Sequence, residues 1–307
     1  MQTKVKNKTL FLKNCLISSD PELYNIKREI KNKKTKFQKA ALADTCSLGK
    51  CFLLNDKLQS AELDEHIYNE ALIHPAMITH GSVKEVLILG GGEGASIREV
   101  LKYKTLRRSV LIEKDREVLS FCKSYLKSWH QGSFNSPRCR LMITDPKTYI
   151  EHAEQKYDLI FSDLPSPEED PSVFHLYTIE FYNKLKYRLR SGGILALQAG
   201  SGNILKLRFH TALYHTLKCL FRYTFPYFVY IPSFNSVWSF FFASNSKNPF
   251  SLNVKQINER ISRLIKGRLS FYDGMTHIGL FNINKDIRSR IASNREIITK
   301  KKFIKFQ

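Results

Sequence analysis

The chain has 307 residues, 43% of them hydrophobic, and a formal net charge of +21. A chain of this size and composition can bury a large core, which excludes an intrinsically disordered protein and leaves room for one large and one smaller domain. The sequence predicts neither a signal peptide nor a membrane span, because charged residues and prolines interrupt its apolar stretches, including the aromatic segment 221–243. We therefore expect a cytoplasmic protein without a membrane-bound part.

The positive charge is concentrated at the two ends of the chain. Residues 1–40 contain 11 Lys and Arg against 3 Asp and Glu, and residues 246–307 contain 14 against 4. Between them, residues 41–245 contain 24 against 21. The basic ends are either solvated tails, which we expect, or a binding region for nucleic acid. The nearly balanced centre favours a cationic ligand over an anionic one.

The N-terminal part of the chain predicts two small units. Residues 1–34 are expected to form a basic extension that is weakly ordered or helical. Residues 35–62 are expected to form a small N-terminal β-hairpin domain, because 35–43 and 49–54 alternate in the manner of strands. Apolar spacing between residues 62 and 80 then predicts a helix.

A short apolar strand runs into a glycine cluster at Val86-Leu87-Ile88-Leu89-Gly90-Gly91-Gly92-Glu93-Gly94. Glycines allow a tight turn and a close approach of the backbone to a ligand, so Gly90, Gly92 and Gly94 are expected to border a nucleotide or nucleoside pocket. Glu93 would repel a pyrophosphate, which disfavours an NAD-type ligand and favours one that is neutral or cationic at this loop.

Beyond the loop, strands and helices alternate. Strands predicted at 109–113, 140–144, 157–162 and 194–198 indicate a Rossmann-like, doubly wound α/β sheet of the class I methyltransferase type, within a catalytic domain at residues 63–290. The remaining elements are expected to be a helix at 204–221, two strands within 227–244, an amphipathic helix at 254–267, a strand at 277–281 and a basic C-terminal tail at 291–307.

Acidic residues follow three of the predicted strands, at Glu113, Asp145 and Asp163. Ligands of open α/β sheets bind at the carboxyl ends of the strands, so these acids are candidate site residues. Glu113 stands about 20 residues beyond the loop, where a carboxylate that binds ribose hydroxyls is expected. For any one of these acids, the alternative is a helix N-cap or a solvated turn residue.

An ordered set of motifs resembles the polyamine aminopropyltransferases, the spermidine and spermine synthase family. The resemblance extends over residues 35–290, and it is closest to the thermospermine synthase branch. The motifs are Leu54 to Ser60, Asp64 to Pro75, Gly90 to Glu99, Tyr157 to Ile160, Leu176 to Thr178, Gly192 to Leu195, Gln198 to Gly200, Ile231 to Phe234 with Trp238, and Tyr272 to His277.

The resemblance implies decarboxylated S-adenosylmethionine as the co-substrate, with no prosthetic group and no metal. This donor lacks the carboxylate of ordinary S-adenosylmethionine but keeps an ammonium group, so Glu93 would favour it over the methyl donor. Glu113 would take the ribose hydroxyls, and Asp145 the adenine amino group. By position, the donor pocket would contain Gln38, Asn69, Gly90, Gly92, Glu93, Gly94, Glu113, Asp145 and Pro146.

The implied acceptor is an amine of putrescine, spermidine or a longer polyamine. Only the neutral amine attacks, and the transfer leaves methylthioadenosine. Asp163 stands at the family's proton-acceptor position, and Tyr68 at the position that helps to hold the amine. Ser166 and Phe234 complete the expected substrate-binding residues.

Ser166 is a departure from the family, which usually has a second Asp there. One charge for the amine is missing unless Glu168, Glu169 or Asp170 replaces it. The sequence therefore leaves open a divergent paralogue that binds the nucleoside ligand without transfer, as well as a methyltransferase on the same fold. Family likeness also implies a homodimer or homotetramer.

Overall fold

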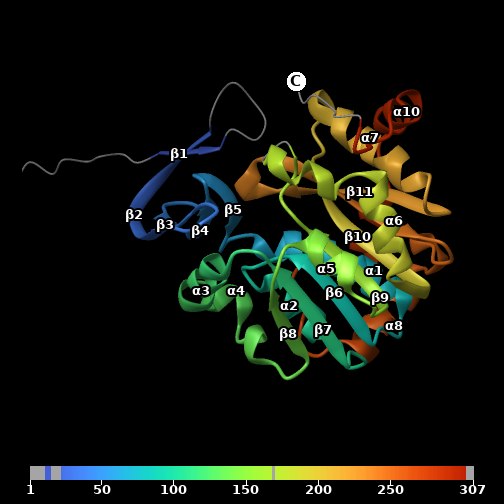
Figure 1. Cartoon of the computed structure of the whole chain (residues 1–307), viewed down its shortest axis with the longest axis horizontal. Helices are drawn as coiled ribbons and strands as arrows, with labels where there is room; N and C mark the ends of the chain where they lie inside the picture. The colour runs from blue at the N-terminus through green and yellow to red at the C-terminus, as the bar shows by residue number, and fades with distance from the viewer. Residues whose placement is uncertain (1–10, 15–21, 168–169, 302–307) are drawn as a thin grey trace, which may run out of the picture.

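The computed structural model describes residues 11–14, 22–167 and 170–301, and their strands form two separate sheets. Figure 1 shows the smaller sheet, in blue, beside the larger one. The smaller sheet has five strands in the order β1-β2-β3-β4-β5. They are β1 at Phe11–Asn14, β2 at Glu22–Lys34, β3 at Lys39–Thr45, β4 at Lys50–Leu54 and β5 at Lys57–Ala61.

The hairpin predicted within residues 35–54 is present as β3 and β4, which pair antiparallel. A second hairpin follows, in which β4 and β5 are joined by only two residues, Asn55 and Asp56. Their φ angles are 50° and 61°. A two-residue turn with positive φ matches the twist of the strands that it joins, and Asn and Asp tolerate this conformation well.

The prediction of a weakly ordered or helical segment before residue 35 is wrong for residues 22–34, which form β2. This strand pairs with β3 along its backbone, while among its residues 25–34 only Ile26 and Ile30 pack against a core. A strand that is held by backbone pairing has little hydrophobic alternation for a sequence to reveal. Residues 1–10 and 15–21 of the expected extension lie outside the described residues.

The larger sheet has seven strands in the order β11-β12-β10-β9-β6-β7-β8. Strands β10, β9, β6, β7 and β8 are parallel, and the hairpin of β11 and β12 adds an antiparallel edge. The predicted Rossmann-like α/β fold is thereby confirmed. The strands are β6 at Glu85–Gly90, β7 at Arg108–Glu113, β8 at Cys139–Ile143, β9 at Tyr157–Asp163, β10 at Leu189–Ser201, β11 at Tyr223–Ile231 and β12 at Ser236–Ser244.

Helices cover both faces of the larger sheet. Along β6, Val86 and Ile88 belong to one core and Leu87 and Leu89 to the other, because successive side chains of a strand point to opposite faces. The first core includes residues of α1, α8 and α9, and the second includes residues of α5, α6 and α7. Accordingly, Figure 1 shows α5 and α6 in front of the sheet, with α1 and α8 behind it. The helices are α1 at Glu65–His80, α2 at Ala95–Leu101, α3 at Arg116–Tyr125, α4 at Lys127–His130, α5 at Pro146–His152, α6 at Ile179–Tyr187, α7 at Leu207–Lys218, α8 at Val254–Leu264, α9 at Gly274–Phe281 and α10 at Lys285–Ser293.

The strand predicted at 277–281 is wrong, because these residues belong to helix α9. Asp273 caps the helix by accepting a hydrogen bond from the backbone of Thr276 at 2.7 Å. His277, Leu280 and Phe281 are buried at spacings of three and four residues, which is the period of a helix face.

The residues after α10 pack against helices α6 and α7. Ile298 is fully buried, its carbonyl oxygen accepts from the backbone of Ile179, and its own N–H donates to the hydroxyl of Thr216. Residues 302–307 of the expected basic tail lie outside the described residues. Among the helices that the structure describes, none has the length and apolar character needed to cross a membrane.

Candidate active site

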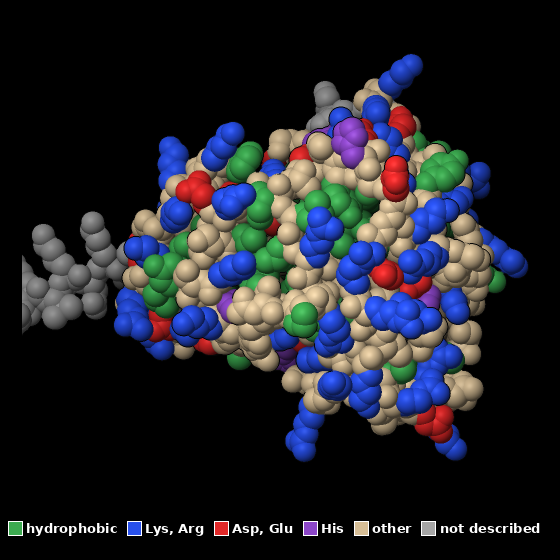
Figure 2. Space-filling model, turned by 60° about the horizontal axis from the view of Figure 1, so that its bottom comes forward, with side chains coloured by type: hydrophobic (Ala, Val, Ile, Leu, Met, Phe, Trp, Pro, Cys, Tyr) green, Lys and Arg blue, Asp and Glu red, His purple; other side chains and the backbone are tan. Residues whose placement is uncertain are grey.

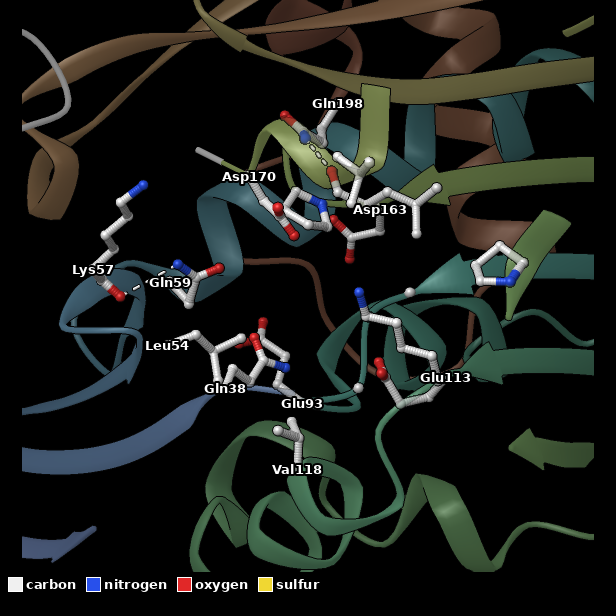
Figure 3. A pocket seen from close by; sticks show the side chains of 18 of the residues that line it. Gln38, Leu54, Lys57, Gln59, Glu93, Glu113, Val118, Asp163, Asp170 and Gln198 are labelled. Carbon is white, nitrogen blue, oxygen red and sulfur yellow. Dashed lines mark hydrogen bonds between the residues drawn. The ribbon is translucent and has the colours of Figure 1, made fainter. Parts of the chain in front are cut away.

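A pocket lies where the smaller sheet meets the carboxyl ends of β6, β7 and β9 (Figure 3). Its wall on the side of the smaller sheet includes Leu54, Asn55, Lys57 and Gln59 of the β4–β5 hairpin. Asn69, Gly94 and Ser166 were also expected in a ligand site, but they do not line this pocket. The predicted site residues that do line it are Gln38, Tyr68, Gly90, Gly92, Glu93, Glu113, Asp145, Pro146, Asp163 and Phe234.

The glycine loop between β6 and α2 lies tightly against its neighbours. Gly90 has a φ of 83° and pairs with Asp163 of β9, whose carbonyl oxygen a Cβ atom at Gly90 would overlap. Gly94 has a φ of 86°, and a Cβ atom there would come within 2.5 Å of the Phe134 ring. Glycine is therefore required at both positions. The tight packing holds Glu93, which lies between these two glycines on the loop's pocket side.

Glu93 is a half-buried carboxyl group in the pocket wall without a cationic partner among the described residues. Burial, together with the nearby Asp163 carboxylate, raises the pKa of Glu93 to about 8. Hydrogen bonds from Ser60 and Asn69 act in the opposite direction, because they stabilise the ionised form. A positive charge bound beside Glu93 would offset both the cost of burying the ionised carboxylate and its repulsion by Asp163.

Asn69 of α1 therefore contributes from behind the pocket wall. Its amide nitrogen donates to the backbone oxygen of Glu65 at 2.8 Å, and its side chain also hydrogen-bonds Glu93. Ser60 contributes from β5 and is itself held by the indole N–H of Trp129, at 2.6 Å. Because the Ser60 oxygen accepts from Trp129, its single proton remains for Glu93.

Glu113 stands at the end of β7, as predicted, and its carboxylate lies beside Gly92. One of its oxygens, Oε1, accepts from the backbone N–H of Asp115 at 2.9 Å. Burial raises the pKa of Glu113 to about 7, although the hydrogen bond from Asp115 opposes this shift. The other oxygen of this carboxylate, Oε2, can accept hydrogen bonds from sugar hydroxyls.

Asp145 caps a helix and also lines the pocket. It caps α5, because Oδ1 accepts from the backbones of Lys147 at 2.9 Å and Thr148 at 3.1 Å. No hydrogen bond to Oδ2 is found within the described residues, and the side chain lines the pocket together with Pro146. Asp145 can therefore cap the helix and accept from a ligand at the same time.

Asp163 is the last residue of β9, and its carboxylate is not a helix cap. Tyr68 donates to Oδ1 at 2.7 Å, and the hydroxyl of Ser96 lies 2.8 Å from Oδ2. Burial raises the pKa of Asp163, while the hydrogen bonds from Tyr68 and Ser96 lower it. The Tyr68 ring is itself held edge-on against Phe234 and Phe240. Asp163 is thus a fixed, half-buried carboxylate at the pocket.

The segment after β9 places Asp170, rather than Ser166, in the pocket wall. Ser166 is buried, and its backbone oxygen accepts from the N–H of Asp170 at 2.9 Å. Figure 3 shows Asp170 and Asp163 on one side of the pocket, opposite Gln38 and Glu93. A carboxylate four residues after position 166 therefore lines the pocket.

Gln198 and Trp238 also line the pocket, although the sequence did not assign them a role there. The amide nitrogen of Gln198 donates to the backbone oxygen of Leu164, and the hydroxyl of Tyr177 donates to the same oxygen at 2.9 Å. Both bonds hold the backbone that follows Asp163. The signal for Gln198 was available, since it is a polar residue near the carboxyl end of a predicted strand, like the three acids.

The pocket is acidic although the chain is strongly basic. Figure 2 shows Lys and Arg side chains spread over the visible face of the molecule. The lining of the pocket includes Lys57 and Lys114 as its cationic side chains, against five acids. Those five are Glu93, Glu113, Asp145, Asp163 and Asp170. Fold and pocket together define an α/β protein with a nucleoside-type site for a positively charged ligand.

Comparisons with known proteins agree with this description. The model of the spermine/spermidine synthase domain matches residues 65–256. A polyamine aminopropyltransferase of Sulfurisphaera tokodaii is 39% identical over 90% of this chain and 91% of its own length. Polyamine aminopropyltransferase 2 of Hyperthermus butylicus is 38% identical over 91% of this chain and 92% of its own length.

Solved structures extend the likeness to three dimensions. Spermidine synthase from Thermotoga maritima superposes with a TM-score of 0.80, at 26% identity, over 89% of this chain and 91% of that one. A spermidine synthase in complex with the transition-state analogue AdoDATO superposes with a TM-score of 0.82, at 25% identity, over 89% of this chain and 92% of that one. The chain belongs to the spermine/spermidine synthase family, the polyamine aminopropyltransferases. This confirms the family and the enzyme class, a transferase, that the sequence predicts.

Proposed function

We propose that the pocket transfers the aminopropyl group of decarboxylated S-adenosylmethionine to an amine of a polyamine, with release of methylthioadenosine. One observation carries this proposal: two half-buried carboxyl groups, Glu93 and Asp163, face one pocket from opposite sides without a cationic partner among the described residues. The reaction brings one cationic group to each of them, the ammonium of the donor and the amine of the acceptor.

The donor is bound along the carboxyl edge of the larger sheet. Glu113 accepts from the ribose hydroxyls, and the Oδ2 oxygen of Asp145 accepts from the adenine amino group. The ammonium group lies at Glu93, whose loop also carries Gly90 and Gly92. Gln38 lines the same part of the pocket. Ordinary S-adenosylmethionine would place a carboxylate near Glu93, so this arrangement disfavours a methyltransferase.

The chemical step is a displacement at the carbon beside the sulfonium. The neutral amine forms the new C–N bond, the C–S bond breaks, and its electron pair neutralises the sulfur. The amine loses one proton, which Asp163 accepts. Burial raises the pKa of Asp163, which makes it a stronger base than an exposed Asp, and Tyr68 holds it in place. Positioning of the two reactants supplies much of the remaining rate enhancement.

Asp170 binds the far end of the acceptor in this proposal. A polyamine has a second ammonium group, and Asp170 lies on the Asp163 side of the pocket, where Ser166 provides no charge. The main reason to consider a non-transferring paralogue was the missing acid at position 166, and the presence of Asp170 in the pocket wall supports transfer. Three features suggested the thermospermine branch: Glu93 and Trp238 line the pocket, and Tyr272 to His277 do not. The acceptor is therefore to be identified by assay among putrescine, spermidine and spermine.

The test measures methylthioadenosine release with decarboxylated S-adenosylmethionine and each amine in turn. Asp163→Asn should lower the amine-dependent rate about 100- to 10,000-fold, as loss of a general base does, while methylthioadenosine still binds. Asp170→Asn should instead raise KM for the preferred amine about tenfold or more, with a smaller change in kcat. Retention of full activity by Asp163→Asn would exclude Asp163 as the base.

Two further features remain proposals. Family likeness supports a homodimer or homotetramer, which light scattering of the purified protein would measure. The same likeness supports a cytoplasmic enzyme. Binding of nucleic acid by the basic ends is less favoured than solvated tails. If such binding occurred, its affinity would fall steeply with added salt.

A further inference from the structure

A buried hydroxyl group lies behind the proposed base and does not line the pocket. Ser96 is in the first turn of α2 and is fully buried. Its Oγ atom lies 2.8 Å from Oδ2 of Asp163 and 2.9 Å from Oδ1 of Asn69. Both neighbours are oxygen atoms that can accept a hydrogen bond, but a serine hydroxyl has only one proton to donate. Ser96 therefore donates to one of them at a time.

The state of Asp163 decides which oxygen receives the proton. An ionised Asp163 is the stronger acceptor, because hydrogen bonds to a charged group are the stronger ones. Once Asp163 has gained a proton, its Oδ2 atom can become the donor, and the Ser96 oxygen must then accept. The Ser96 proton is free to turn to Asn69, so that no buried polar group loses its partner.

Asn69 is fixed in the orientation that this exchange needs. Its amide nitrogen donates to the backbone oxygen of Glu65 at 2.8 Å and to Oε2 of Glu65 at 3.2 Å. With its nitrogen held in this way, the amide of Asn69 directs its carbonyl oxygen toward Ser96. Glu65 is in turn held by Arg98, whose two terminal nitrogens lie 2.8 and 3.0 Å from its two carboxylate oxygens. The acceptor that Ser96 needs in the second state is thus held by a bidentate ion pair.

Ser96 also has room to accept a hydrogen bond. No donor to the Ser96 oxygen is found within the described residues, so Ser96 can accept from a protonated Asp163. Ser60, the other serine behind the pocket, differs in this respect, because its oxygen already accepts from the indole N–H of Trp129 at 2.6 Å.

We infer that Ser96 is a positioning residue whose hydroxyl turns between Asp163 and Asn69 as Asp163 gains and loses the proton of the acceptor amine. The inference rests on the proposed role of Asp163 as the base. Ser96 gives up no proton of its own, and the exchange changes only its orientation. The other titratable groups around Asp163 are Tyr68 of α1, Glu93 of the glycine loop and Asp170 of the segment after β9.

The variants Ser96→Ala and Ser96→Thr test this inference. We expect Ser96→Ala to lower kcat about tenfold, because the ionised and the protonated Asp163 each lose a partner. With the donor saturating, the lower break in kcat/KM for the amine against pH should move upward by about one unit, because the ionised form loses the stronger bond. Ser96→Thr keeps the hydroxyl and should restore both values. Methylthioadenosine should bind all variants alike, which shows that they fold.

A matched control is Ser109→Ala, which removes another fully buried serine hydroxyl, one that donates to the backbone of Arg138 at 2.8 Å. Equal losses in Ser96→Ala and Ser109→Ala, or an unmoved break in Ser96→Ala, would overturn the inference. So would a failure of Ser96→Thr to rescue. An active Asp163→Asn variant would contradict the proposed function itself, whereas an inactive one beside an unaffected Ser96→Ala would contradict only the role of Ser96.

Discussion

Binding of the donor should depend on pH, because Glu93 must be ionised to attract the ammonium group. In the empty site, burial and the neighbouring Asp163 raise the pKa of Glu93 to about 8. Below that pH the carboxyl group is mostly protonated, and a bound ammonium would have to displace the proton. Affinity for decarboxylated S-adenosylmethionine should therefore rise with pH up to about 8 and then level off.

The size of the effect follows from the pKa. At pH 6 about 1% of the molecules have an ionised Glu93, so Kd should be about 100-fold weaker than at pH 9. Near pH 7 binding should release about 0.9 proton per site, and near pH 9 about 0.1. The donor's own amine, with a pKa of about 10, stays protonated over most of this range.

Calorimetry in two buffers of different ionisation enthalpy measures the released proton directly. Methylthioadenosine is the matched control ligand, since it contains the adenine and ribose but no ammonium. In the proposed binding mode Glu113, whose pKa is raised to about 7, contacts the ribose of both ligands, so its contribution cancels in the comparison. Glu93→Gln is the matched protein. Equal proton release by both ligands, or by Glu93→Gln and the native chain, would refute the reasoning.

Two more predictions follow from the buried acids. Glu93→Gln should weaken binding of decarboxylated S-adenosylmethionine about 10- to 100-fold and reduce its advantage over S-adenosylmethionine. Competition with labelled methylthioadenosine would measure both affinities. An unchanged ratio of the two affinities would contradict a role of Glu93 in donor choice. Glu99 is fully buried, and although burial opposes ionisation, the hydrogen bond from His74 and the charges of His74, Lys102 and Arg98 lower its pKa to about 2. The stabilisation from Glu99 is therefore present above about pH 4.5 and is lost as the pH falls toward 2, by about 3 kcal/mol. Urea unfolding should show this loss of stability in the native chain and a smaller loss in Glu99→Gln. The variant should also be less stable than the native chain at pH 7. Parallel curves of stability against pH would contradict the stabilising role of ionised Glu99.

The larger sheet could be predicted because its strands are buried on both faces. Residues 86–90 and 157–162 are nearly continuous apolar runs, and the acids that follow such runs had to meet at one edge. Glu113, Asp145 and Asp163 accordingly share one pocket. The sequence could not reveal β2, because backbone pairing rather than side-chain alternation holds it.

The residues behind the pocket could not be predicted, since their role depends on which atoms meet in space. Ser96 and Asn69 lie on different helices, and only the packing of α1 against α2 brings their oxygens within 2.9 Å. Asp170 was one of three acids that could replace the missing charge at position 166, and its place in the pocket wall follows from the path of the chain after β9. Spacing along a sequence does not specify such a path.

The β4–β5 hairpin has a consequence for how new acceptor preferences can evolve. It forms a wall of the pocket, yet its strands belong to the smaller sheet, and it turns through only two residues, Asn55 and Asp56. A surface turn can be lengthened at a small cost in free energy. Insertions here would reshape this wall of the pocket and leave the proposed nucleoside contacts of Glu113 and Asp145 intact. Substrate range can therefore diversify by changes in a peripheral turn, under separate selection from the sheet that binds the donor.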